Sequence, residues 1–467
     1  MPDRHDVVIL GAGPGGEVAV NTLLKAGKRV ALVEPELIGG ECTNWGCIPS
    51  KTLLRPPDLK GESAKAAGVG EPRLDFARLA EYRDYMVSNH DDSRAVARYE
   101  SRGVTVVKAP GMIAGPRRVE ADGEVLEADA IVVATGAEAV IPPIPGLEET
   151  GYWTNRDATA LSELPRSAAF IGGGVVSVEL AQFMARFGVQ CTVIGPSLAA
   201  REDPRVSERL AEILEEDGIE LRIGPRAEAV RRDDADRVVS LDNGEEVRAE
   251  VVVVAVGRRP RTHGFGLENV GVEPGPRGIE VDEHCRAADG VWAIGDCTGG
   301  AFTHVAKYQA RIAASDICGR PAKADYRAVP RVLFTEPEIA SVGLTEEDAR
   351  NQGIDVISAV IDLPTTVARP YTYEEHPKGS FGVIADRRRN VLVGAFALAP
   401  LAGEWIHQAV LAIRAEIPLS VLTDTIQQFP TFSEAFGLAL RALPDEALMS
   451  VDHCAHPMIE QPLAEVK

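Results

Sequence analysis

Two cysteines lie close together in the stretch GGECTNWGCIPSK, residues 39–51. Cys42 and Cys47 are five positions apart, with a glycine pair before them and a Pro-Ser-Lys turn after them. Such a pair can serve as metal ligands, as a structural disulfide or as a redox couple. A metal site needs further donors, and no third Cys or His lies nearby in the sequence. Closing so short a loop with a structural disulfide contributes little entropy. The surrounding elements must therefore decide the role of the pair.

A glycine-rich turn near the start of the chain is typical of a dinucleotide site. Residues 7–34, VVILGAGPGGEVAVNTLLKAGKRVALVE, predict a strand, a turn, a helix and a second strand. The turn has the pattern G-x-G-x-x-G at Gly11, Gly13 and Gly16, and Glu34 ends the second strand. The glycines let the backbone approach a pyrophosphate, the helix N-terminus stabilises its charge, and the acid binds a ribose hydroxyl. The unit predicts a bound dinucleotide rather than a glycine-rich turn without a ligand.

The same unit occurs a second time, which predicts a second nucleotide. Residues 168–195 repeat the strand, turn, helix and strand, with Gly172 and Gly174 in the turn and Ser177 at the third small position.

The two units differ in the residue that follows the second strand. Glu34 lies 23 residues after Gly11, whereas the residue 23 positions after Gly172 is Gly195. Arg201 follows six residues later. Loss of the acid removes repulsion toward a 2′-phosphate, and an arginine can bind that phosphate with two hydrogen bonds. The second unit therefore favours NADPH over NADH, unless Arg201 belongs to a surface ion-pair run, REDPR.

Other apolar runs complete an α/β protein. AIVVATGA (130–137), VVVVAVGRRP (251–260) and VWAIGDCTGG (291–300) each predict a buried strand that ends in a small-residue turn. The last run places Asp296 at the carboxyl end of a strand, where open α/β sheets bind ligands. From about 326 to 450, short strands alternate with amphipathic helices and no phosphate-binding loop occurs, which predicts a separate α/β domain.

Composition limits the partners and the compartment. The chain has 467 residues, 49 basic and 70 acidic side chains, and a net charge of −21. This balance speaks against a nucleic-acid or anionic-membrane partner. Seven cysteines spread over the chain are not a secreted disulfide framework. No basic-apolar leader and no apolar run of membrane length is found in the sequence. We therefore expect a cytoplasmic protein with a small-molecule substrate.

These motifs resemble the pyridine nucleotide-disulfide oxidoreductases, the flavoprotein group of dihydrolipoyl dehydrogenase, glutathione reductase and mercuric reductase. GAGPGG, GGECTNWGCIPSK, ATGA, GGGVVSVE, VGRRP, AIGDC and VLFTEPEIASVGLTE occur in the family's order and spacing, over almost the whole chain. The stretch CTVIGPSLAAREDP looks most like the equivalent part of mercuric reductase.

The resemblance implies two Rossmann-like dinucleotide-binding domains plus a C-terminal α/β dimerisation domain. The FAD-binding domain would be discontinuous, at 1–155 and 275–325, with the NAD(P)H-binding domain at 156–274 and the dimerisation domain at 326–467. FAD and NADPH, or NADH, would be the cofactors, and the partner would be a second copy of the chain in a homodimer with shared active sites. The implied cofactor-binding residues are Gly11, Gly13, Gly16, Glu34, Gly40, Thr135, Gly136, Gly172, Gly174, Arg201, Gly257 and Asp296, the last at the ribitol.

The resemblance also assigns roles to the two cysteines. It implies that Cys47 lies against the flavin as the charge-transfer thiolate and that Cys42 attacks the substrate. Lys51 would pair with Glu179, and this cation would favour the reduced anionic flavin and lower the pKa of the thiolate. Electrons would pass from nicotinamide to flavin, then to the cysteine couple, and then to a substrate by thiolate exchange. The alternative for Lys51 is an ordinary surface position.

One departure from the family concerns the proton donor. Where dihydrolipoyl dehydrogenase has His-Pro-Thr with a Glu five residues after the His, this chain reads IQQFPTFSEAF, residues 426–436. Glu434 matches, but Phe429 takes the position of the His, so the acid-base partner of Cys42 is missing. His304 and His407 are the alternative proton donors.

Two other family members help to interpret this departure. Mercuric reductase also lacks that His, but its vicinal C-terminal cysteines are absent here, where the tail VDHCAHPMIE has only Cys454. 2-Ketopropyl coenzyme M oxidoreductase/carboxylase is similar in having Phe at that position, although its Glu position also differs.

Three functions remain open on the sequence. The first is an FAD-dependent NAD(P)H oxidoreductase that passes electrons through Cys42 and Cys47 to an atypical disulfide, thioether or metal ion. The second is a flavin-level reductase of quinones or oxygen that makes little use of the pair. The third is a redox-silent FAD-binding subunit that serves as a docking partner.

Overall fold

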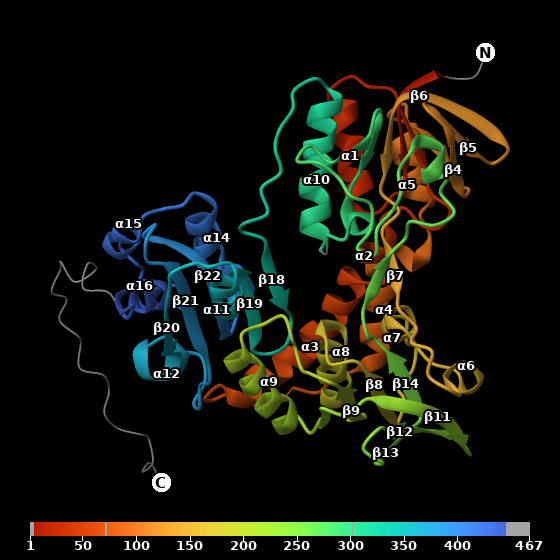
Figure 1. Cartoon of the computed structure of the whole chain (residues 1–467). Helices are drawn as coiled ribbons and strands as arrows, with labels where there is room; N and C mark the ends of the chain where they lie inside the picture. The colour runs from red at the N-terminus through yellow and green to blue at the C-terminus, as the bar shows by residue number, and fades with distance from the viewer. Residues whose placement is uncertain (1–3, 71, 301, 445–467) are drawn as a thin grey trace, which may run out of the picture. The chain divides into compact units, whose positions relative to one another are not determined.

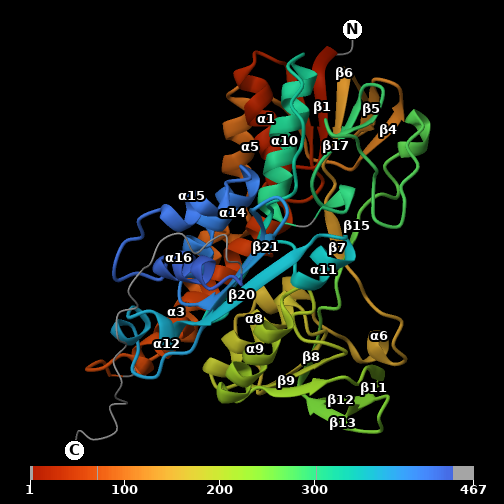
Figure 2. The same ribbon diagram turned by 60° about the vertical axis from the view of Figure 1, so that its left-hand side comes forward.

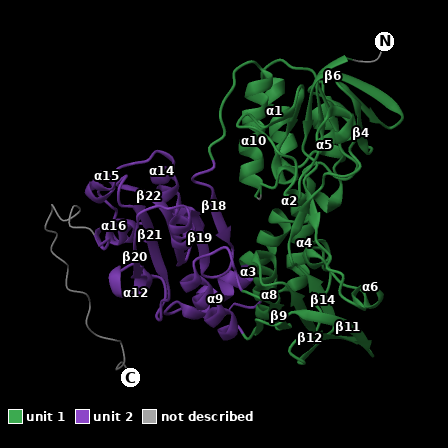
Figure 3. Cartoon of the chain, in the orientation of Figure 1, with its two compact units in different colours: residues 1–55, 75–197, 218–325 green, residues 56–74, 198–217, 326–467 purple. Residues whose placement is uncertain are grey.

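The computed structural model describes residues 4–70, 72–300 and 302–444. Its chain forms two compact units, coloured separately in Figure 3. Unit 1 comprises residues 1–55, 75–197 and 218–325, and unit 2 comprises residues 56–74, 198–217 and 326–467. Helix α3 (Cys47–Lys65) contributes to both units. The finer division into three domains stays a prediction.

Unit 1 is built on a mainly parallel sheet with the strand order β16-β17-β6-β1-β2-β3 (Figure 1). The strands of this sheet, with the β4–β5 hairpin that extends β6, are β1 (Arg4–Leu10), β2 (Val30–Val33), β3 (Thr105–Val107), β4 (Gly111–Gly115), β5 (Arg118–Ala121), β6 (Glu124–Val133), β16 (Arg286–Ala288) and β17 (Val291–Ala293).

Side chains of β1 alternate between two apolar cores because successive residues of a strand point to opposite faces. Val7 and Ile9 belong to the core that includes residues of α1 (Pro14–Lys25) and α10 (Thr303–Ile317). Val8 and Leu10 belong to the core that includes β4, β5 and β6. Helices α1 and α10 lie side by side next to the sheet (Figures 1 and 2), with Gly15 facing Ala306.

A second parallel sheet in unit 1 has the order β10-β9-β8-β14. Its elements, with the helix that joins the first two strands, are β8 (Ser167–Ile171), α8 (Val175–Arg186), β9 (Gln190–Gly195), β10 (Glu220–Ile223) and β14 (Val251–Val254). Both predicted strand-turn-helix-strand units, at 7–34 and 168–195, are therefore confirmed.

Smaller elements complete unit 1. A three-stranded antiparallel sheet and a two-stranded pair consist of β11 (Ala227–Asp233), β12 (Asp236–Leu241), β13 (Glu246–Ala249), β7 (Ala137–Ala139) and β15 (Arg258–Pro260). The remaining α-helices that the structure describes in unit 1 are α2 (Gly40–Asn44), α4 (Phe76–Met86), α5 (Ser93–Glu100), α6 (Leu147–Thr150) and α7 (Asn155–Thr159). Helices α3, α4 and α5 make most of the described part of residues 55–100 helical.

Unit 2 contains a five-stranded antiparallel sheet in the order β18-β19-β22-β21-β20. Its strands are β18 (Pro330–Leu333), β19 (Glu338–Gly343), β20 (Val356–Asp362), β21 (Ser380–Asp386) and β22 (Val391–Ala399), and its helices include α9 (Pro204–Glu216), α11 (Glu346–Asn351), α12 (Leu363–Thr366), α13 (Ala402–Trp405), α14 (His407–Arg414), α15 (Leu419–Asp424) and α16 (Glu434–Arg441). Every residue of β22 is buried, which explains its uninterrupted apolar sequence VLVGAFALA. The predicted C-terminal α/β region is confirmed.

Several thiols lie deep in unit 1, away from solvent. Cys191 on β9, Cys285 and Cys297 are buried. Burial raises the pKa of Cys191 to about 12 and that of Cys297 to about 11.

Within the residues that the structure describes, no helix has the length and apolarity that crossing a membrane requires.

Candidate functional site

The cysteine-bearing segment is anchored on the first glycine-rich turn. The Gly39 N–H donates to the Ala12 carbonyl at 2.8 Å. Gly40 has φ +56°, and a Cβ atom there would lie 2.7 Å from the Gly13 Cα atom. Glycine alone permits this left-handed conformation and close approach at little cost. The glycine pair of the motif therefore places α2 directly against the turn.

The two sulfur atoms are within hydrogen-bonding distance. Cys42 Sγ donates to Cys47 Sγ at 2.6 Å, and Cys47 Sγ lies 3.5 Å from Oγ1 of Thr303, the first residue of α10. The hydrogen bond from Cys42, aided by Thr303 and the charge of Lys51, lowers the pKa of Cys47 to about 6 although burial opposes the shift. A helix N-terminus also stabilises a thiolate. Donating that hydrogen bond, together with burial, raises the pKa of Cys42. At neutral pH the pair is therefore a Cys47 thiolate beside a Cys42 thiol.

Lys51 follows Cys47 by one turn of α3 and makes the contact that the resemblance implied. Its Nζ donates to Glu179 Oε2 at 2.6 Å. Glu179 lies on α8, and its side chain is only 4% exposed. Because a buried carboxylate needs a counter-ion, Glu179 holds the positively charged Lys51 side chain in place one turn after Cys47. The catalytic role of both residues stays a prediction.

A carboxylate beside Cys42 was not identified from the sequence. Glu41 accepts from Asn155 Nδ2 at 2.8 Å and from Arg156 Nε at 2.9 Å, and lies 3.3 Å from Arg258 NH1. These donors hold the pKa of Glu41 below its ordinary value despite burial. The Arg156 guanidinium also lies 3.9 Å above the ring of Trp45. The only sequence signal was the position of Glu41 and Trp45 inside the cysteine motif, since their partners come from distant segments.

The first glycine-rich turn has the shape that a dinucleotide requires. A Cβ atom at Gly11 would lie 2.3 Å from the Ala134 carbonyl oxygen, and one at Gly16 would lie 2.1 Å from the Gly11 oxygen, whereas Gly13 faces open space. Glu34 accepts from the Ala12 N–H at 2.7 Å, and burial raises the pKa of this carboxyl. An open Gly13 at the N-terminus of α1, with an acid beside it, fits a pyrophosphate and a ribose.

The other residues predicted for the cofactor lie at nearby strand ends. Asp296 follows β17, burial raises its pKa, and its carboxylate accepts no hydrogen bond from the described part of the chain. Such a carboxylate fits the hydroxyl groups of a ribitol chain. Thr135 Oγ1 donates to the Arg261 carbonyl at 2.6 Å, while Gly136 and Gly257 flank the β7–β15 pair with φ +74° and +142°. The residues present therefore fit FAD at this turn.

The second turn has the same shape. A Cβ atom at Gly172 would lie 2.3 Å from the Ala255 oxygen, and Gly174 faces open space at the N-terminus of α8. Gly195, at the end of β9, would place a Cβ atom 2.9 Å from the Gly173 nitrogen. Arg201 belongs to unit 2 and these glycines belong to unit 1. Its role in reading a 2′-phosphate therefore stays a prediction.

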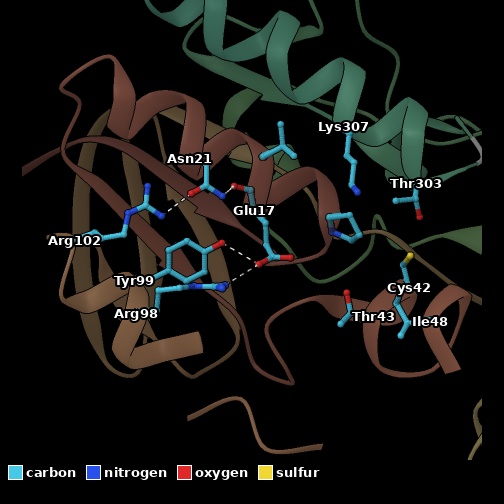
Figure 4. Close-up of a pocket in the computed structure, with 12 residues that line it drawn as sticks. Glu17, Asn21, Cys42, Thr43, Ile48, Arg98, Tyr99, Arg102, Thr303 and Lys307 are labelled. Atoms are coloured by element: carbon cyan, nitrogen blue, oxygen red, sulfur yellow. Dashed lines mark hydrogen bonds and ion pairs between the residues drawn. The ribbon is translucent and has the colours of Figure 1, made fainter. Parts of the chain in front are cut away.

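A pocket of about 380 Å³ opens beside Cys42 (Figure 4). Its lining residues come from α1, the cysteine-bearing segment, the region of α5 and the first turns of α10: Pro14, Glu17, Val18, Asn21, Cys42, Thr43, Ile48, Arg98, Tyr99, Arg102, Thr303 and Lys307. Tyr99 donates its hydroxyl proton to Glu17 Oε1 at 2.9 Å. Burial raises the pKa of Glu17, and burial together with Glu17 raises the pKa of Tyr99 to about 12. The sequence does not reveal this pocket because its lining residues share no motif.

The residues of the substituted acid-base pair lie in unit 2. Phe429 is 72% exposed. Glu434 begins α16, and its Oε2 atom is buried without a hydrogen-bond partner among the described residues. Burial raises the pKa of this carboxyl. The roles of Phe429 and Glu434 stay predictions.

The alternative proton donors lie apart in the chain. His304 is exposed on the first turn of α10 in unit 1, with its ring stacked on Phe302 at 5.3 Å. His407 is exposed at the start of α14 in unit 2.

Cys454 falls outside the described residues. Across residues 4–70, 72–300 and 302–444, no group of three or more His, Cys, Asp or Glu is placed to hold a metal ion.

A family model described as pyridine nucleotide-disulphide oxidoreductase matches residues 5–310, and the model of that family's dimerisation domain matches residues 329–440. The chain belongs to this family. The family is FAD-dependent, uses a pyridine nucleotide and forms homodimers through the dimerisation domain. The predicted family and fold class are thus confirmed.

Curated relatives of the oxidoreductase extend over nearly its whole length. Mercuric reductase of Staphylococcus aureus is 32% identical over 465 residues, which covers 97% of this chain and 84% of the relative. Dihydrolipoyl dehydrogenase of Thermus scotoductus is 34% identical over 459 residues, which covers 95% of this chain and 98% of the relative. Two relatives of nearly equal similarity therefore have different named activities.

Solved structures give the same result for the fold. The HOCl-induced flavoprotein disulfide reductase RclA of Escherichia coli, solved as a Cu(II) complex, has a TM-score of 0.82 and 27% identity, covering 94% of this chain and 99% of that one. LpdA of Mycobacterium tuberculosis has a TM-score of 0.84 and 28% identity, covering 93% and 99%. The chain is an oxidoreductase of the flavoprotein disulfide reductase group.

Proposed function

We propose that this oxidoreductase uses NADPH to reduce a small-molecule acceptor through the Cys42–Cys47 couple. The observation that carries the proposal is the sulfur pair itself, in which a Cys42 thiol donates to a Cys47 thiolate at 2.6 Å. A purely structural disulfide would not need the Lys51 charge or the α10 N-terminus beside it. Bound FAD supplies the transfer of two electrons from the nicotinamide to the disulfide form of the pair.

The hydrogen bond between the sulfurs offers a proton route that needs no imidazole. As Cys42 Sγ attacks one sulfur of a disulfide acceptor RSSR, its proton passes to Cys47 and the first RS⁻ leaves. Cys47 Sγ then attacks Cys42 Sγ, the mixed disulfide breaks, and the proton neutralises a departing thiolate. The overall reaction is NADPH + H⁺ + RSSR → NADP⁺ + 2 RSH, in which the acceptor disulfide is reduced and the nicotinamide is oxidised.

Phe429 limits which acceptors react well. A general acid contributes about 10²–10⁴-fold to such a reaction, and a phenyl ring cannot supply a proton. Lipoamide and glutathione disulfide should therefore be poor substrates, and acceptors whose leaving group is stable as an anion should be better ones. In the homodimer we infer shared active sites, with the Phe429 region of one subunit serving the cysteines of its partner.

The preference for NADPH rests on the second turn. Gly195 stands where the first turn has Glu34, so no carboxylate at this position repels a 2′-phosphate. Arg201 is the cation that we propose to bind it.

The decisive experiment compares Cys42→Ser with Cys318→Ser in steady-state assays with NADPH. Cys318 is a partly exposed thiol on the C-terminal side of α10, and its replacement controls for the loss of a sulfur. Reduction of an aromatic disulfide should fall by roughly 10³-fold or more in Cys42→Ser and stay unchanged in Cys318→Ser. Equal disulfide reduction by both variants would favour the flavin-level quinone or oxygen reductase. Absence of any NADPH oxidation in wild type would favour the docking subunit.

A second variant examines the substituted acid-base pair. Phe429→His should raise turnover of lipoamide and glutathione disulfide, because it restores an imidazole next to Glu434. An unchanged rate, together with loss of activity in His304→Ala or His407→Ala, would move the proton route to one of those residues.

A further inference from the structure

The pocket beside Cys42 has a charge opposite to that of the whole protein. The chain carries a net charge of −21, yet the pocket is lined by Arg98, Arg102 and Lys307 against a single carboxylate, Glu17. A local excess of positive charge within an acidic protein attracts anions to that place and leaves the rest of the surface repulsive to them.

Two of the three cations are already engaged. Arg98 NH2 lies 3.7 Å from Glu17 Oε1, so its charge is largely balanced. Arg102 NH1 donates to Asn21 Oδ1 at 2.6 Å, and this neutral amide leaves the charge of Arg102 uncompensated. Lys307 has no hydrogen bond or ion pair to any of the described residues, and it is exposed. Lys307 is therefore the cation most available to a ligand.

The helix that carries Lys307 also sets its distance from the sulfurs. Thr303 and Lys307 are four residues apart on α10, so they share a face of the helix about 6 Å apart. Thr303 is the residue whose Oγ1 contacts Cys47 Sγ at 3.5 Å. Figure 4 shows Lys307 and Thr303 above the pocket on the same helix, with Cys42 beside Thr303 and the Arg98–Tyr99 group at the opposite end. A small ligand can thus contact Cys42 Sγ and Lys307 Nζ at once.

We infer that the pocket selects an acceptor that carries an oxyanion, such as a carboxylate, and that Lys307 is the residue that determines this specificity. This inference rests on the proposed function for the identity of the acceptor as a disulfide. Lys307 holds the oxyanion, Arg102 adds to the attraction, and the apolar side chains of Val18 and Ile48 contact the body of the molecule. The volume of about 380 Å³ suits a small acceptor rather than a protein segment.

The first test uses two disulfides that share the same aromatic core and differ in charge. Dithiobis(nitrobenzoate) carries two carboxylates, and its bis(hydroxyethyl) carboxamide is neutral, while both release a coloured thiolate that needs no proton. We expect kcat/KM to favour the carboxylate compound, and we expect Lys307→Gln to reduce that preference by about tenfold, the value of a charged hydrogen bond. A higher salt concentration should reduce the preference of the wild-type enzyme for the carboxylate disulfide.

Lys25→Gln is the matched control. Lys25 is exposed at the last turn of α1 and does not line the pocket. It lies ten residues, or about 15 Å along the helix, beyond Gly15, which faces Ala306 next to Lys307, so its distance from the Lys307 level exceeds the Debye length at physiological salt, although Asn21 at the far end of the pocket is only four residues away. Lys25→Gln removes the same charge as Lys307→Gln, and it should leave the preference for the carboxylate disulfide unchanged.

A second test does not depend on turnover of any disulfide. In a Cys47→Ser background, where Cys42 is the remaining sulfur of the pair, enzyme reduced with dithiothreitol is alkylated at Cys42 with iodoacetate or with iodoacetamide, and the modified residue is located by peptide mass. Lys307→Gln should lower the ratio of the iodoacetate rate to the iodoacetamide rate by roughly three- to tenfold relative to the protein that keeps Lys307. If the ratio depends on Lys307 but no disulfide is reduced, the anion-selective pocket stands and the proposed disulfide acceptor falls. The inference would be overturned if Lys307→Gln and Lys25→Gln changed the disulfide preference and the alkylation ratio equally. A wild-type preference for the neutral disulfide would also overturn it.

Discussion

The two glycine-rich turns of unit 1 share one backbone frame and differ in the residue that follows it. Gly11 N–H donates to the Val33 carbonyl at 2.8 Å, and Gly172 N–H donates to the Ile194 carbonyl at 2.7 Å. The clash distances agree as well, since a Cβ atom on either glycine would lie 2.3 Å from the carbonyl oxygen of the alanine that directly follows a strand, Ala134 after β6 or Ala255 after β14. The frame is therefore set by backbone packing and is indifferent to which nucleotide binds.

What distinguishes the turns is the end of the second strand. Glu34 reaches the Ala12 N–H with its carboxylate at 2.7 Å. The equivalent Gly195 lies so close to Gly173 that any side chain would force the turn to shift. The absence of an acid at the second turn is thus also a packing requirement. The comparison teaches that two copies of one backbone frame can present different groups to a ligand through the residue that ends the second strand.

The strongest way to break the comparison is to replace the equivalent glycines. Gly11→Ala and Gly172→Ala each force a positive φ and a collision with a carbonyl oxygen, at a cost of at least about 3 kcal/mol. We expect Gly11→Ala to be purified without flavin. Gly172→Ala should keep its flavin and lose reduction by NADPH. Absorbance spectra and stopped-flow reduction measure the two properties.

Gly27→Ala separates backbone strain from the collision. Gly27 has φ +77° with nothing near its Cβ position, so it carries only the strain. Flavin content and NADPH reduction should both persist in this variant. If Gly11→Ala retained full flavin occupancy, the first turn would not be the FAD site.

Arg201→Ala sharpens the comparison at the level of the phosphate. We expect kcat/KM for NADPH to fall by roughly 1.5–3 kcal/mol, the value of a charged hydrogen bond, with NADH nearly unaffected. Arg209→Ala, which removes a partly exposed arginine of α9 paired with Glu212, should affect neither nucleotide. Equal losses for NADPH and NADH would show that Arg201 does not read the phosphate.

The corresponding change at the first turn is Glu34→Ala. Loss of the carboxylate should weaken FAD by about 1–3 kcal/mol, because a ribose hydroxyl loses its partner. Titration of apoprotein with FAD measures the change, and Glu34→Gln should show a smaller loss because it keeps an acceptor. An unchanged FAD affinity would remove Glu34 from the site.

The smallest expected effect concerns the helices that follow the turns. Seven residues after Gly172 lies Glu179, which holds Lys51, whereas seven residues after Gly11 lies Val18. The Cys47 pKa of about 6 means that the thiolate is present above that pH and is lost as the pH falls through it. Lys51→Met should raise this midpoint by about one unit, or about 1.4 kcal/mol.

The long-wavelength charge-transfer absorbance of the two-electron-reduced enzyme reports this titration. Lys51→Arg keeps the positive charge and should leave the midpoint near that of wild type. In Cys47→Ser the band should be absent at every pH, and in Cys42→Ser it should be present even in the oxidised enzyme. A midpoint that does not move in Lys51→Met would show that the Cys42 hydrogen bond alone sets the thiolate.

Much of this architecture could be predicted because glycine spacing reports backbone requirements directly. Gly11, Gly172 and Gly40 each occupy a position where a side chain would collide with backbone, so their spacing carries the geometry. The family resemblance supplied the Lys51–Glu179 contact, which joins helices that are far apart in the sequence.

The surroundings of Glu41 and the pocket beside Cys42 could not be predicted, because they are formed by residues from distant segments that meet only in the folded chain. Glu41 meets Asn155 and Arg258 from segments more than a hundred residues away. Glu17 and Lys307 lie on two helices whose apolar periodicity shows only which face is buried. Single charged residues on exposed helix faces are common, and nothing in one sequence says that two such faces meet beside a sulfur atom.

The buried thiols have a consequence for how the enzyme ages under oxidative stress. Oxidants and alkylating agents react with thiolates, and the raised pKa values of Cys191 and Cys297 keep these groups protonated and inert. Cys47, with a pKa of about 6, is the thiolate that such agents meet first. Reversible oxidation of this pair ends in a Cys42–Cys47 disulfide, which the proposed cycle would reduce again. Oxidation, unlike alkylation, is thus directed to the pair that the proposed function can restore, while the buried thiols are spared.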